Sequence, residues 1–147
     1  MSRFGRTPLH VACRSSSVSS LPLPSLHLNV LDDHGFSPLY SSCLSSSTFH
    51  HVLSLLAEPG IDISLPDKGG LTAFHAACYH GNVPAALLLA SLQFGALVVV
   101  RDSIGRTGRD WAVAKMHVDV VKALDERMQQ QEQQQQQEQE QQGGQER

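Results

Sequence analysis

The sequence predicts an all-α fold in which short helix-turn-helix units, separated by short β-turns, stack into a solenoid. Three observations predict it: a motif repeats along the chain, each copy begins with residues that favour a helix start, and apolar residues then recur at helical spacing. The glycine that opens each copy recurs after 30, 35 and 35 residues. The four copies lie at 5–13, 35–43, 70–78 and 105–113. A chain of 147 residues has room for one such array and for no second large domain.

Each copy is expected to begin with a tight turn and a capped helix. An Asp stands three residues before the glycine in the last three copies, and this pairing favours a turn because Asp bonds nearby backbone while Gly accepts positive φ. The Ser or Thr two residues after each glycine is predicted to cap the first helix. Pro8 and Pro38 follow at the first helical position, where a missing N–H costs nothing.

A second helix is expected in most units. Its apolar residues recur at helical spacing within 52–56, 85–92 and 120–124. In the first unit, Pro22 and Pro24 forbid a regular helix. The stretch 69–100 carries no charged residue, but Pro84 and Gly95 interrupt it, so we interpret its second half as a short buried helix followed by an extended turn and not as a membrane span.

The composition divides the chain into three parts. Residues 1–31 form a degenerate first unit with a Ser/Pro-rich connection, residues 32–127 form the repeats, and residues 128–147 form a Gln/Glu-rich tail. The tail is expected either to prolong the last helix (119–127) into solvent until Gly143 and Gly144 end it, or to form a self-associating polyglutamine segment. Its interspersed glutamates favour the solvated tail, partly helical and partly disordered.

The repeated pattern resembles the ankyrin repeat, whose hallmark is Thr-Pro-Leu-His after an Asp-x-x-Gly turn. Residues 7–10 match this hallmark in full, and residues 60–67 resemble the connecting segment of the family. The resemblance covers residues 2–127 and implies about four repeats, of which the first and second are degenerate. Tyr40 and Asp110 stand where the family has His. The family implies a protein-interaction module, a scaffold or adaptor; the alternative is a residual fragment of a larger ankyrin-repeat protein without independent function.

The resemblance also implies where a partner would bind. Ankyrin units present their turn tips and the concave face of their first helices, whose side chains are not needed for stacking. Apolar residues on these turns would be the anchors and charged residues the rim. The alternative for Phe36 and Leu71 is that they only cover neighbouring turns and contact no partner. The expected partner-binding residues are Asp33, His34, Phe36, Lys68, Leu71, Tyr79, His80, Ile104 and Arg106.

Two His-x-x-Cys pairs raise the question of a zinc site. His10 with Cys13, and His75 with Cys78, would supply four ligands, but the pairs lie two units apart, and zinc needs its donors around one point. The ankyrin resemblance implies instead that each His bonds a neighbouring loop and that each Cys is a small packed residue. No Gly-x-Ser-x-Gly elbow or phosphate-binding loop occurs. We therefore expect no metal, no cofactor and no enzyme activity.

The charge and the cysteines predict the setting. The net charge of −3 lies entirely beyond residue 125, so residues 1–125 are formally neutral and lack the basic excess that nucleic acid or acidic lipid would attract. Three widely spaced cysteines and an N-terminus without an apolar signal predict a reducing, intracellular and cytoplasmic setting. We expect a monomer that binds an unidentified protein, without nucleic acid or membrane.

Overall fold

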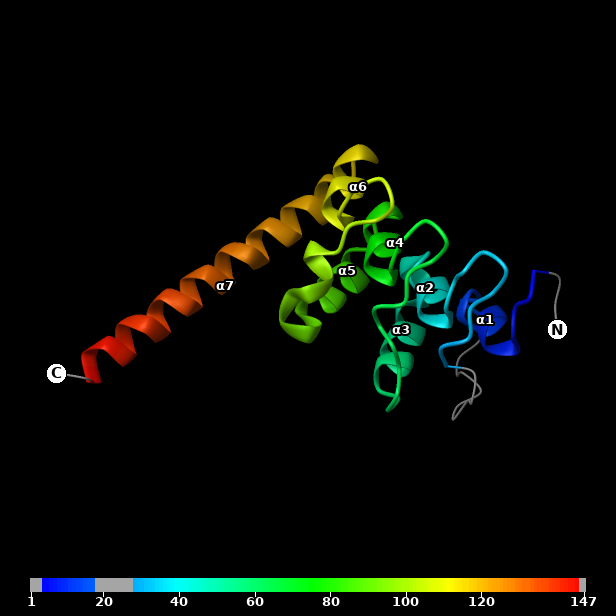
Figure 1. Cartoon of the computed structure of the whole chain (residues 1–147), viewed down its shortest axis with the longest axis horizontal. Helices are drawn as coiled ribbons and strands as arrows, with labels where there is room; N and C mark the ends of the chain where they lie inside the picture. The colour runs from blue at the N-terminus through cyan, green and yellow to red at the C-terminus, as the bar shows by residue number, and fades with distance from the viewer. Residues whose placement is uncertain (1–3, 18–27, 146–147) are drawn as a thin grey trace.

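The computed structural model describes residues 4–17 and 28–145, without the side chains of 93–96 and 145. This described part contains helices and turns and no strand, so the all-α prediction is confirmed for it. Figure 1 shows the short helices packed in chain order from the N-terminus, and the long last helix extending away from them. The α-helices are α1 (Pro8–Cys13), α2 (Pro38–Ser42), α3 (Phe49–Leu56), α4 (Ala73–Tyr79), α5 (Val83–Ser91), α6 (Gly108–Ala114) and α7 (Val118–Gln145).

The first helices of the four units, α1, α2, α4 and α6, pack one against the next. Each begins directly after the residue predicted to cap it: Thr7, Ser37, Thr72 and Thr107 all stand at the N-cap with extended backbone. The Ser37 hydroxyl accepts the N–H of Tyr40 at 3.1 Å, which satisfies one of the free donors of the first turn. The short first helices are therefore defined by their caps.

The second helices form a second layer behind the first. Helix α3 packs on α2, α5 on α4, and α7 on α6, and α5 lies between α3 and α7. A short 3-10 helix, η1 (Ser46–Thr48), precedes α3, and another, η2 (Leu92–Val99), follows α5. The extended turn predicted after α5 is therefore wrong; Leu97 is buried to 1% exposure, and tight helical turns carry it there. The proline-broken segment of the first unit lies largely within 18–27, outside the described residues.

The core lies between the layers and is built from small and medium apolar residues. Cys13, Cys43 and Cys78 occupy the same position in successive units and are each fully buried and free of disulfides. Burial raises the pKa of each thiol to about 12, so all three behave as small apolar side chains. This agrees with the role that the resemblance implied for them.

Helix α7 is longer than predicted at both ends. It begins at Val118 and continues through Gly143 and Gly144 to Gln145, whereas the glycines were expected to end it. A glycine lowers helix propensity by about 1 kcal/mol but does not forbid helical backbone, and the preceding Gln and Glu residues are good helix formers. Side chains 129–144 are all exposed. No helix in the described part of the chain is long and apolar enough to cross a bilayer.

Candidate binding surface

Three turns of the array share one hydrogen-bond pattern. In the turn before α2, the Asp32 carboxylate accepts the backbone N–H groups of His34 and Phe36 at 2.9 and 3.0 Å. The Asp32 N–H in turn donates to the Phe36 carbonyl at 3.0 Å. Asp67 and Asp102 make the same contacts with the residues two and four positions after them. The predicted Asp-x-x-Gly turns are confirmed, and each is held by one carboxylate.

Neighbouring turns lie against each other. The Asp33 N–H donates to the Phe4 carbonyl, and the Ser103 N–H donates to the Gly69 carbonyl, both at 2.9 Å. A Cβ on Gly70 would lie 3.0 Å from the Ser103 nitrogen, and Gly70 also has a φ of +78°. This position therefore requires glycine for its backbone conformation and for the close approach of the next turn. A Cβ on Gly35 would likewise lie 2.9 Å from the Lys68 nitrogen of the third turn, so the turn tips form one continuous row.

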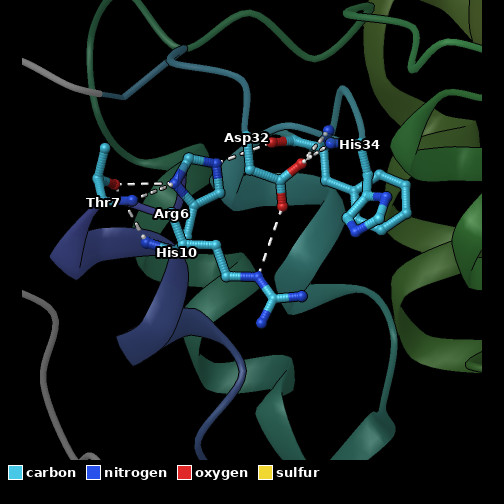
Figure 2. A network of polar contacts seen from close by, with 6 residues as sticks. Arg6, Thr7, His10, Asp32 and His34 are labelled. Atoms are coloured by element: carbon cyan, nitrogen blue, oxygen red, sulfur yellow. Dashed lines mark hydrogen bonds and ion pairs between the residues drawn. The ribbon is translucent and has the colours of Figure 1, made fainter. Parts of the chain in front are cut away.

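Buried histidines connect the helices to this row of turns. The Thr7 N–H donates to Nδ1 of His10 at 3.2 Å, so the ring proton lies on Nε2, which donates to the Phe36 carbonyl of the next turn at 2.8 Å. Figure 2 shows Thr7 and His10 beside the Asp32 turn, with Arg6 of the first unit reaching the Asp32 carboxylate. His75 makes the same pair of contacts, with Thr72 and with the Arg106 carbonyl.

The two departures from the family's His have different structural consequences. Tyr40 is buried; burial, followed by the charge of Asp67 on the next turn, raises its pKa. Asp110 keeps the local part of the pattern, because its Oδ2 accepts the Thr107 N–H at 3.0 Å. Tyr40 thus packs on Phe36 of its own unit, and Asp110 caps its own helix.

The first group of predicted binding residues lies on the turn before α2. His34 is exposed, and its ring lies between those of Phe4 and Phe36, with centroid distances of 5.6 and 5.5 Å. Phe36 is half-buried and stacks on Tyr40 at 4.4 Å. Asp33 is exposed beside them. The structure thus brings these side chains together, with Phe36 as part of the packing.

A second group lies across α4 and α6, and we call it the aromatic strip: Tyr79, Arg106, Trp111 and Lys115. The Arg106 guanidinium lies 4.7 Å from the Trp111 ring centre, and the Lys115 ammonium lies 4.6 Å from the Tyr79 ring centre. The two rings are 5.4 Å apart. His80 packs on Tyr79 at 4.9 Å, and burial together with the charge of His117 lowers its pKa.

The remaining predicted residues differ in exposure. Ile104 is 64% exposed at the tip of the last turn, and Lys68 is exposed on the preceding one. Leu71 is partly buried and packs against the core, as does Phe36. Sequence reasoning missed Trp111, which occupies the position of Val11, Ser41 and Ala76 in the other units. The available signal was that this is the only tryptophan of the chain.

The structure also bears on a possible metal site and on the arginines near the last turn. No group of three or more His, Cys, Asp or Glu side chains within 4–17 and 28–145 is placed to hold a metal ion. Among the arginines near the last turn, Arg109 makes two hydrogen bonds to Asp125 of α7, at 2.8 and 2.9 Å. Arg101 donates to the Gly105 carbonyl at 2.9 Å. These contacts hold the last unit together and leave Arg106 on the aromatic strip.

Known proteins match the chain over most of its length. A family model described as ankyrin repeats (many copies) matches residues 45–90. The SMC5-SMC6 complex localization factor protein 1 of Bos taurus is 34% identical over 116 residues, which is 75% of this chain and 11% of that protein. Rabankyrin-5 of Mus musculus is 31% identical over 124 residues, or 81% of this chain and 10% of that protein.

A third relative, the ankyrin repeat and LEM domain-containing protein 1 homolog of Caenorhabditis elegans, is 38% identical over 76 residues, which is 52% of this chain and 10% of that protein. The chain therefore spans about a tenth of the length of each of these relatives. The family match lies across the second and third of the units described above, and the Asp turns, caps and bridging histidines recur around it. The chain is an ankyrin-repeat protein.

Proposed function

We propose that this chain binds a partner protein through its row of turn tips and the neighbouring face of the first helices. The observation that carries the proposal is the contact between successive turns, because it sets residues from different units side by side. Ankyrin repeats are protein-interaction units, and such stacked units offer an extended surface whose side chains are not used in stacking. Residues 32–127 are the repeats that form this surface.

The solvent exposure of each predicted side chain decides which residues can test the proposal. Phe36 and Leu71 are packed against the core, so their truncation would change stability as well as binding. Ile104 and His34 are exposed on turn tips and carry contact area with little core. Val99, which is 72% exposed at the end of η2, is a matched exposed aliphatic residue outside the turn itself.

The experiment is affinity purification with the full chain, followed by calorimetric titration of the partner that is recovered. Ile104→Ala and His34→Ala should each weaken binding, by about 2 kcal/mol where the side chain is central to the interface, without lowering the melting temperature. Val99→Ala should bind as the parent does. Binding that survives both turn variants and is lost on deletion of residues 129–147 would transfer the function to the tail.

Cooperative unfolding separates this proposal from the alternative of a remnant without function. A working array should unfold in one transition, because each unit is stabilised by its neighbours. We propose further that the chain is a monomer in a cytoplasmic setting and catalyses no reaction. Sedimentation of the purified chain tests the first of these statements, since self-association through the Gln-rich tail would raise the apparent mass with concentration.

A further inference from the structure

The aromatic strip contains two cations that lie on two aromatic rings across two adjacent units. Arg106 follows the last turn and lies over Trp111, while Lys115 at the end of α6 lies over Tyr79 at the end of α4. The contact between the two rings joins these pairs into one surface. A cation on a ring face is held in place by the ring quadrupole and keeps its full charge.

Neither of these cations forms an ion pair within the described part of the chain. Ion pairs within 4–17 and 28–145 join Arg6 to Asp32 and Arg109 to Asp125, and involve neither Arg106 nor Lys115. Both side chains are exposed. The strip therefore presents two oriented positive charges to a partner.

Two carboxylates of the same unit, Asp102 and Asp110, are used by the chain itself. Asp102 is only 8% exposed; it accepts the N–H groups of Ile104 and Arg106 and, at 2.7 Å, the indole N–H of Trp111. Burial raises the pKa of Asp102, but these hydrogen bonds outweigh burial and lower it overall, so the group stays ionised. Asp110 is exposed and caps α6 through the Thr107 N–H. Asp102 thus fixes the edge of the indole ring and leaves its face to Arg106.

We propose that the aromatic strip binds an acidic peptide segment, with carboxylates paired to Arg106 and Lys115 and an apolar side chain placed on the Tyr79 and Trp111 rings. This inference rests on the proposed function and names the chemistry of the partner. A peptide fits better than a nucleic acid, because binding to a phosphate backbone needs many cations, whereas residues 1–125 are formally neutral. Rings fixed before binding reduce the ordering cost of association.

Trp111 provides the readout, since it is the only tryptophan of the chain and its emission reports on the strip directly. The probe is a synthetic peptide Glu-Asp-Phe-Glu-Asp, titrated into the full chain at low and high salt. Its uncharged match is Gln-Asn-Phe-Gln-Asn, and its opposite is Lys-Arg-Phe-Lys-Arg. The acidic peptide should change the Trp111 emission in a saturable way that weakens with salt, and the other two peptides should not.

Substitution locates the binding. Arg106→Gln and Lys115→Gln should each weaken binding of the acidic peptide by up to about fivefold, the upper end for an exposed charge pair, and Arg106→Lys should recover part of the loss. Lys122→Gln, at an exposed lysine of α7, is the matched control and should bind as the parent does. Melting curves of all four variants establish that each remains folded.

Three outcomes overturn the inference. The first is an acidic peptide that leaves the Trp111 emission unchanged or binds Arg106→Gln and Lys115→Gln as well as the parent. The second is a single-stranded oligonucleotide that binds the strip more tightly than the acidic peptide, which would make the ligand a nucleic acid. A partner whose binding depends on Ile104 and His34 but not on Arg106 or Lys115 would reject the acidic ligand and leave the proposed function in place.

Discussion

Gly108, at the first position of α6, packs closely against α4, the first helix of the preceding unit. A Cβ built on Gly108 would lie 2.6 Å from Cε1 of Phe74 and 3.0 Å from Sγ of Cys78. Phe74 is fully buried and stands where the first two units have Leu9 and Leu39. The larger ring therefore occupies the space that a side chain at position 108 would need. This explains why the last unit lacks the proline that the repeat pattern has there.

Replacing Gly108 by alanine sets two effects against each other. Alanine favours a helix over glycine by at most about 1 kcal/mol. Against this, the new methyl group must displace the buried Phe74 ring, and overpacking of this kind costs about 1 to 3 kcal/mol. We expect Gly108→Ala to lower the free energy of unfolding by about 1 to 2 kcal/mol. Urea unfolding followed by the helical circular dichroism signal measures it.

A double-mutant cycle tests the cause. In a Phe74→Leu background the shorter side chain frees the space, so Gly108→Ala should cost at least about 1 kcal/mol less than in the parent. Gly143→Ala in α7 is the matched control, because nothing lies within 4 Å of a Cβ there, and it should leave stability equal or slightly higher. The reasoning is wrong if Gly108→Ala stabilises the protein, or if its cost is the same in both backgrounds.

Three further predictions concern burial and ionisation. Leu89, which is fully buried, should not tolerate aspartate: Leu89→Asp should abolish the cooperative transition, because an unpaired buried carboxylate costs several kcal/mol, whereas the exposed Lys68→Ala should melt as the parent does. Stability should fall as pH rises above 9.0, the ordinary pKa of a thiol, because burial raises the pKa of all three thiols to about 12 and each then contributes a loss of about 1.4 kcal/mol per pH unit. Equilibrium unfolding measured against pH tests this, and a free energy of unfolding that stays constant above pH 9.0 in the parent would refute it. Replacing Cys13, Cys43 or Cys78 by alanine should make the fall with pH less steep. Burial lowers the pKa of His75 despite its bond to the Arg106 carbonyl, so the folded state favours the neutral ring and stability should be lost as pH falls below 6.5; a His75→Gln variant with an unchanged pH profile would contradict this.

The sequence by itself determined the units and their beginnings. The caps at Ser37 and Thr107, and the turns at Asp32, Asp67 and Asp102, follow from contacts between residues two to four positions apart. Such contacts depend on local spacing alone, so a repeated motif predicts them wherever it occurs. The same spacing predicted the order in which the first helices pack.

The tertiary structure alone decided which side chains from different units meet. Trp111 becomes part of a surface because Asp102 bonds its edge, Arg106 covers its face, and Tyr79 arrives from the preceding unit. Gly108 likewise fits closely on the buried Phe74 ring of the preceding unit. The sequence around either residue does not reveal this contact. Contacts across the stack depend on the size and direction of both partners at once. A sequence read unit by unit fixes the repeating frame, whereas the packing between units determines the surface that the frame presents.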